Sequence, residues 1–224
     1  MADSCCVGMM RGCTKLSTVP DKLPAMVMKS QCYTSMFYGC TSLTKAPELP
    51  ATTLFKSCYS TMFRGCTSLT KAPELPATTL AESCYSTMFR GCTSLTKAPE
   101  LPATTLATSC YANMFYDCKK INYIKTNFTS WLDGATSTWL YNVASTGTFI
   151  CSSELDITQS GTSYIPEGWL TVLNGSKDAP YEWLSILDSN YPENTISIPI
   201  ATNSYEGNRY YGWNVKSSLI KVNL

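Results

Sequence analysis

Residues 65–92 read GCTSLTKAPELPATTLAESCYSTMFRGC, and most of this passage also occurs upstream and downstream. The cysteines that mark the copies fall into two columns with a period of 26 residues: Cys32, Cys58, Cys84 and Cys110, then Cys40, Cys66, Cys92 and Cys118. A looser first copy contributes Cys5 and Cys13, each 27 residues before its counterpart in the next copy. A fixed period of roughly 20 to 50 residues is typical of chains in which each copy stacks on the next. We therefore expect a stack of copies.

Each copy combines a segment with helical features and an extended segment. In SCYSTMFRG a serine precedes apolar residues at roughly helical spacing, and Gly65 and Gly91 stand where a left-handed helix cap belongs. The following CTSLTKAPELP contains two prolines, so we expect strands of about two to four residues, with Leu69 and Leu95 pointing inward. The expected fold class is therefore α/β, a leucine-rich-repeat solenoid of about five copies, each with a short helix and a short strand.

The recurring residues C-Y-x-x-M-F-x-G-C-x-S-L-x-x-A-P-x-L-P-A-T-T-L resemble the BspA-like leucine-rich repeat family of gut Bacteroidota and their phages. The resemblance covers residues 4–126 strongly. It continues more weakly through WLDGATSTWLYNVASTGTFICSS and YIPEGWLTV, which look like the segment that closes such arrays. The resemblance implies a right-handed solenoid used on a surface for adhesion or recognition, and it implies no reaction.

The composition changes along the chain and suggests three parts: a repeat solenoid over 1–126, a C-terminal capping region over 127–173, and a small α+β tail over 174–224 for docking or ligand contact. The stretch TSWLDGATSTWLYNVA is typical of a helix or helix pair, which would cover the open end of the stack, as solenoids require. The apolar residues expected to form this cap are Trp131, Leu132, Trp139, Leu140 and Val143.

The overall charge and the missing residue types exclude several classes of function. The formal net charge is +1, from 17 basic and 16 acidic residues, which gives no electrostatic footprint for nucleic acid or an anionic membrane. No apolar run reaches the roughly 18 residues of a membrane span, and MADSCCVGMMRGC does not resemble a secretory signal. The sequence has no histidine, which removes the commonest zinc ligand and every Ser-His or Cys-His dyad.

The 12 cysteines allow three interpretations. Zinc is poorly supported, because the C-x7-C spacing contains no CxxC pair. Disulfides are geometrically feasible, since stacked strands about 4.8 Å apart match disulfide Cα separations of about 4.4 to 6.8 Å, but no cysteine in a column has a unique partner. We favour free thiols as small buried hydrophobes, which implies folding in a reducing cytosol. Cys5, Cys6 and Cys151 are the off-pattern candidates for a catalytic thiol, and none has a histidine to activate it.

Variation between the copies indicates where a partner would bind. The residue before the repeat Gly or Asp is Tyr38, Arg64, Arg90 or Tyr116, and Arg and Tyr dominate interface hot spots. A second candidate surface lies in the tail, at Tyr205, Asn208, Arg209, Tyr210, Tyr211 and Trp213.

Two charged columns are weaker candidates for the same role. They consist of Lys45, Lys71 and Lys97, and of Glu48, Glu74 and Glu100. Three residues apart on an extended segment, they are expected on opposite faces, although the intervening prolines (Pro47, Pro73 and Pro99) bend that geometry. Solubility and edge protection are the simpler explanation of both columns.

These features predict a non-enzymatic surface recognition or adhesion protein without cofactor, most simply a phage virion fibre or decoration component. Such a protein would bind a host cell-surface glycan or protein, and a partner subunit or another copy would cover its uncapped N-terminal end. The alternatives are a Bacteroidota cell-surface adhesin without its leader and a structural virion protein without host binding. The chain would thus act on a virion or bacterial surface. A glycosidase using Glu154 and Asp156, or Asp178 and Glu182, is the remaining alternative.

Overall fold

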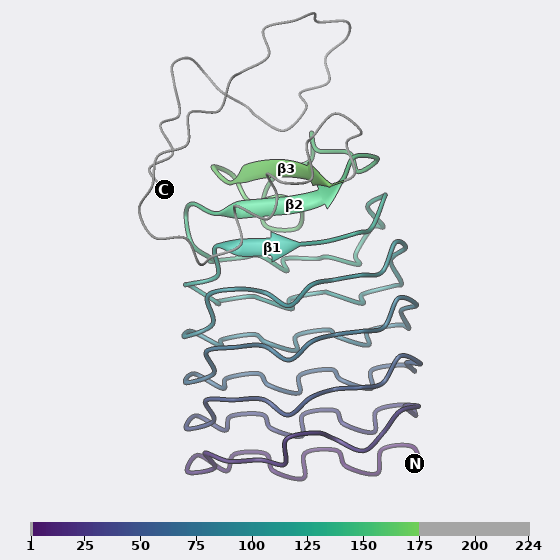
Figure 1. Ribbon diagram of the computed structural model, residues 1–224, viewed down its shortest axis with the longest axis vertical. Coiled ribbons are helices and arrows are strands. Elements are labelled where there is room, and N and C mark those ends of the chain that lie inside the picture. Colours follow the sequence, from purple (N-terminus) through teal and green to yellow (C-terminus); the bar gives the residue numbers. More distant parts are fainter. Residues whose placement is uncertain (1, 175–224) are drawn as a thin grey trace, which may run out of the picture.

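The structure is a computed structural model, and it describes residues 2–174. In this part of the chain successive copies form coils that stack on one another, starting from the N-terminus (Figure 1). Three short strands lie toward the other end: β1 (Tyr123–Lys125), β2 (Thr148–Ser152) and β3 (Leu170–Asn174). They form a parallel sheet in the order β1-β2-β3, with Ile124 opposite Phe149 and Val172 opposite Ile150.

The predicted α/β leucine-rich-repeat solenoid with one helix per copy is wrong. The described residues form no helix, and their only strands are β1, β2 and β3. Accordingly, residues 2–174 contain no helix of the length and apolarity needed to cross a membrane. Where a helix was expected, each coil makes a series of right-angled steps (Figure 1).

We call this side of the coils the turn wall, formed by residues 3–13, 30–40, 56–66, 82–92, 108–118 and 133–142. Its backbone enters the left-handed region at every fourth residue, as at Ser57 (φ 53°), Thr61 (φ 56°) and Gly65 (φ 73°). A right-handed helix requires negative φ throughout, so these residues exclude one. The left-handed conformation predicted for Gly65 and Gly91 is confirmed, but each glycine ends a run of turns and not a helix.

Backbone hydrogen bonds in the turn wall alternate between two directions. The amide of Phe63 donates to the carbonyl of Met88 in the next coil, at 2.9 Å. The amide of Met62 donates within its own coil, to the carbonyl of Tyr59 three residues earlier, at 3.3 Å. Because every second N–H bonds to the next coil, stacking supplies the hydrogen bonds that a helix would otherwise make internally.

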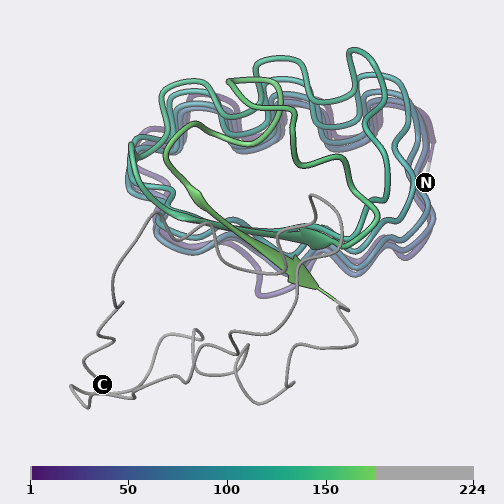
Figure 2. The same cartoon turned by 90° about the horizontal axis from the view of Figure 1, so that it is seen from above.

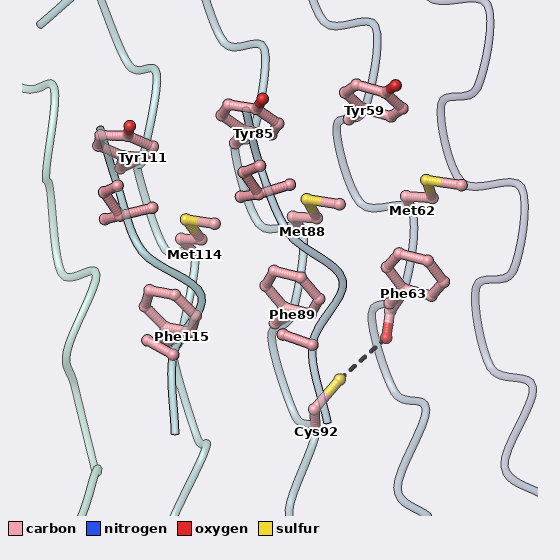
Figure 3. Close-up of a cluster of buried hydrophobic side chains, with 14 of the residues drawn as sticks. Tyr59, Met62, Phe63, Tyr85, Met88, Phe89, Cys92, Tyr111, Met114 and Phe115 are labelled. Carbon is pink, nitrogen blue, oxygen red and sulfur yellow. Dashed lines mark hydrogen bonds between the residues drawn. The ribbon is translucent and has the colours of Figure 1, made fainter. Parts of the chain in front are cut away.

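The side chains behind the turn wall explain why copies of one sequence stack so closely. The rings of Tyr59 and Tyr85 lie 5.8 Å apart and those of Phe63 and Phe89 lie 5.7 Å apart, stacked in both cases (Figure 3). Helices pack about 8 to 10 Å apart, too far for such ring contacts between consecutive copies. A flat turn wall therefore suits the repeated aromatic residues better than a helix.

The opposite side of each coil is extended and is held by few backbone pairs. Isolated parallel bridges such as Lys45 with Lys71 join the repeats, and continuous strands begin only at β1. Figure 2 shows this side across the coil from the turn wall. Leu69 and Leu95 are fully buried, as predicted, and Ile121 is buried in the equivalent position.

The helical cap predicted for residues 129–144 is also wrong, because this stretch forms a further turn wall. Gly134, Thr138 and Asn142 have positive φ, and the amide of Phe115 donates to the carbonyl of Trp139 at 3.0 Å. Trp139 is buried against the end of both ring columns, whereas Leu132 is 42% exposed. The predicted domain boundaries stay predictions, and residues 175–224 lie outside the described part of the chain.

The cysteines of both columns are buried packing residues, as the sequence indicated. The thiols of the second column also donate to backbone carbonyls of the preceding coil: Cys92 Sγ donates to the Phe63 carbonyl at 3.1 Å (Figure 3). Burial raises the pKa of the Cys66 thiol to about 12 and holds that of Cys92 well above its usual range. Cys151 in β2 is equally buried, and desolvation raises its pKa to about 12, which is the reverse of what a nucleophile needs.

Candidate functional site: a ladder of arginine and tyrosine

Four of the predicted contact residues occupy equivalent positions in consecutive coils of the turn wall. Each stands just before the last left-handed residue of its coil, and the backbone fixes its alignment with the next. The amides of Gly39, Gly65 and Gly91 donate at 2.8 Å to the carbonyls of the next residues in the column. The column extends by one residue at each end, and we call the whole set the Arg–Tyr ladder: Arg11, Tyr38, Arg64, Arg90, Tyr116 and Tyr141.

Small residues beside the ladder leave it accessible. A Cβ added to Gly65 would meet only the backbone of Gly39, at 3.8 Å from its Cα atom, and the same holds for Gly91 over Gly65. The repeat therefore places a strip of bare backbone next to the ladder. The positive φ of these glycines disfavours any other residue there.

The ladder side chains are ordered by contacts with one another. The guanidinium Cζ atoms of Arg11 and Arg64 lie 4.8 and 5.4 Å from the ring centroid of Tyr38. That of Arg90 lies 4.1 Å from the centroid of Tyr116. The ring of Tyr116 is in turn stacked on that of Tyr141, with centroids 4.6 Å apart. Cation–π and ring stacking thus hold the column in place before any ligand arrives.

The arginines of the ladder have spare hydrogen-bonding capacity. Among residues 2–174, no carboxylate lies within ion-pair distance of Arg11, Arg64 or Arg90; the ion pairs there involve lysines. The nearby carboxylate of Asp117 accepts a hydrogen bond from Asn142 at 2.8 Å. A guanidinium stacked by its face keeps its in-plane N–H donors free, so the ladder can bind acceptors such as carboxylate, sulfate, phosphate or sugar oxygens.

Sequence reasoning missed both ends of the ladder. Arg11 stands before Gly12 as Arg64 stands before Gly65, so alignment of the looser first copy could have found it. Tyr141 precedes Asn142 in the unrepeated part, where no repeat signal marks it. The tail candidates lie outside the described residues: Tyr205, Asn208, Arg209, Tyr210, Tyr211 and Trp213.

The charged columns on the extended side were expected on opposite faces, and this is wrong, because both lysine and glutamate columns are exposed. Lys45 pairs with Asp21 at 3.0 Å, and Lys125 pairs with Glu100 at 3.0 Å. Exposed pairs of this kind contribute little to stability, which agrees with a role in solubility.

A pocket of about 550 Å³ near Trp131 contains one of the carboxylate pairs considered for a glycosidase, Glu154 and Asp156. The Asp156 carboxylate accepts hydrogen bonds from the hydroxyl and amide of Thr158, at 2.6 and 3.0 Å, and from Gln159. These bonds lower the pKa of Asp156, so Asp156 lacks the raised pKa that the general acid of such a pair needs and is suited only to the base or nucleophile. The second pair, Asp178 and Glu182, lies outside the described residues.

Within residues 2–174, no three potential metal ligands come together. Comparisons with protein-family models, curated proteins and solved structures give no match. The resemblance to BspA-like repeats therefore stays a prediction from the sequence.

Proposed function

We propose that this protein is a non-enzymatic recognition protein that binds its ligand along the Arg–Tyr ladder. One observation carries the proposal: the ladder arginines stack on tyrosines, and no carboxylate of residues 2–174 pairs with them. Arg and Tyr contribute most to binding at interfaces, and a pre-ordered column loses little side-chain entropy when a ligand binds. An elongated ligand with repeated acceptors, such as a glycan or an extended protein segment, matches this shape.

The setting we propose is the surface of a phage particle, where the protein would serve as a fibre or decoration component that contacts the host cell. The support is the resemblance of the repeats to proteins of Bacteroidota and their phages. A cell-surface adhesin is the alternative from the same resemblance. Both rest on the same ligand-binding ladder, so one experiment tests the binding role.

The experiment measures saturable binding of fluorescently labelled protein to intact Bacteroidota cells, with and without their capsular polysaccharide. The ladder variant is the double substitution Arg64→Ala/Arg90→Ala. Its matched control, Lys45→Ala/Lys71→Ala, removes the same charge from the extended side. We expect the ladder variant to bind at least about tenfold more weakly, because hot-spot truncations cost about 2 kcal/mol or more. The control should stay within about twofold of the parent, since exposed lysines rarely contribute more than a fraction of that.

Loss of binding together with the capsule would identify a glycan as the ligand. Equal binding by parent and ladder variant would contradict the proposed site. Absence of binding to every strain would contradict the recognition role and favour a structural role in a particle.

A further inference from the structure

All backbone-to-backbone hydrogen bonds between coils of the turn wall point in the same direction along the stack. The first coil donates from Ser4, Cys6, Gly8, Met10 and Gly12 to carbonyls of the second coil, at 2.7 to 2.9 Å. The second coil donates in the same way to the third, and the pattern continues to the coil that contains Trp139. In these backbone bonds the donor is on the coil nearer the N-terminus and the acceptor is on the coil nearer the C-terminus.

The two ends of the wall consequently differ in polarity. The peptide unit between Tyr38 and Gly39 accepts a bond from Gly12 at 2.7 Å and donates one to Arg64 at 2.8 Å. Peptide dipoles in such rows are aligned, as they are along a helix, and their negative ends all face the first coil. The N-terminal end of the stack is therefore an edge of acceptors.

On the first coil no described residue donates to these acceptors. Within the described part of the chain, the carbonyls that face away from the second coil have no hydrogen-bond partner, and all of the residues that carry them are exposed: Asp3, Cys5, Val7, Met9 and Arg11. The equivalent carbonyls of the second coil all accept bonds. The first coil thus has the backbone geometry of an interior coil, with no hydrogen-bond partner among residues 2–174 on its outer side.

On the same edge, side chains whose equivalents in later coils are buried in the core are exposed. Met9 is 55% exposed, whereas Met36, Met62 and Met88 in the same column are buried. Cys5 and Cys13 are exposed, whereas the later cysteines of both columns are buried. Apolar side chains and free carbonyls therefore face outward together.

We propose that the first coil is a docking edge for a partner polypeptide that presents a row of backbone N–H donors with apolar side chains between them. A head-to-head pair of two copies would place one row of carbonyls against another, with parallel negative dipole ends in contact. The row of carbonyls on the first coil therefore favours a partner whose edge carries N–H donors. It disfavours a second copy of the chain in the head-to-head arrangement. This inference is independent of the Arg–Tyr ladder.

The test uses a synthetic peptide of residues 57–82 as the probe, under reducing conditions, with binding to the full chain followed by fluorescence anisotropy. In the structure, this segment donates to its C-terminal neighbour from Tyr59 and Phe63, among others. N-methylation at these two positions removes donors without changing side chains. N-methylation at Thr78 and Thr79, whose amides form no hydrogen bond among the described residues, is the matched control.

We expect the unmodified peptide and the control peptide to bind, and the peptide methylated at Tyr59 and Phe63 to bind at least about tenfold more weakly. On the protein, Met9→Asp should weaken binding, whereas Leu132→Asp should not, since Leu132 is also exposed, at 42% against 55% for Met9, but lies on a later coil. Both side chains are exposed, so neither variant should unfold the chain.

Three outcomes would overturn the proposal. The first is an absence of peptide binding, and the second is equal binding by the two methylated peptides. The third is a dimer of the chain that a bismaleimide links through Cys13 of both copies and that Met9→Asp abolishes. That dimer would show that two acceptor edges do pair head to head.

Discussion

The cysteines of both columns act as small apolar residues, and those of the second column also donate a weak hydrogen bond. Each thiol of the second column fills the layer between two coils and bonds to a carbonyl of the coil before, as Cys66 does to Phe37 at 3.1 Å. The shared cause of their raised pKa values is desolvation, which disfavours the thiolate. The same burial that stabilises the coils thus makes them sensitive to alkali.

We predict that the protein loses stability as the pH rises above about 9. Burial raises the pKa of Cys58 and Cys66 from 9.0 to about 12, so the folded state keeps protons that the unfolded state releases. The contribution of these two thiols to stability is complete below pH 9 and is lost as the pH rises toward 12. Within that window each such thiol lowers the free energy of unfolding by about 1.4 kcal/mol per pH unit.

Denaturant unfolding at pH 7, 9 and 10.5 under reducing conditions measures this loss. Cys66→Ala should make the free energy of unfolding fall less steeply with pH, by the contribution of one thiol. Cys13→Ala, which removes an exposed thiol, should leave this slope unchanged. A stability that is independent of pH across this range would show that the column thiols are not buried.

At the scale of the element, the turn wall depends on residues that tolerate positive φ. Glycine occupies one of its left-handed positions, but Ser57, Thr61 and Thr87 occupy others, and a β-branched residue is unfavourable there. In the next coil the position equivalent to Thr87 holds Asn113, with φ 55°. Asparagine is among the non-glycine residues that adopt this conformation most readily.

Thr87→Asn should therefore stabilise the protein by about 0.5 to 1 kcal/mol, part of the cost of a left-handed residue. The Thr87 hydroxyl has one side-chain contact to lose, with Ser86 Oγ at 3.4 Å. Thermal unfolding compares this variant with Thr79→Asn, an exposed position without positive φ, where no gain is expected. A lower stability of Thr87→Asn would mean that interactions of the threonine side chain stabilise the fold by more than the gain from an easier left-handed backbone.

At the scale of the molecule, the period of the sequence predicted which side chains share a core column but not the path of the backbone between them. From the second copy onward, the recurring Tyr, Met, Phe and Cys residues are buried behind the turn wall. The serine taken as a helix cap misled, because Ser57 and Ser83 adopt positive φ themselves. Local propensities could not reveal this, since the hydrogen bonds that favour the turn wall come from neighbouring coils.

The candidate site, too, could be predicted from the sequence only in part. Variation between copies pointed to Tyr38, Arg64, Arg90 and Tyr116, because side chains that differ at a fixed position of the repeat lie on its surface. Their mutual stacking depends on the spacing of the coils, which no single copy encodes. Arg11 and Tyr141 joined them only when the inter-coil hydrogen bonds aligned the irregular copies.

The most direct test of this fold is the measurement of scalar couplings across backbone hydrogen bonds by NMR on the reduced protein. The turn wall predicts a coupling between the amide nitrogen of Phe63 and the carbonyl carbon of Met88, 25 residues later in the sequence. A helix in the same stretch would instead couple Phe63 to Tyr59, four residues earlier. The first result would establish stacked coils with a polar turn wall, and the second would contradict them.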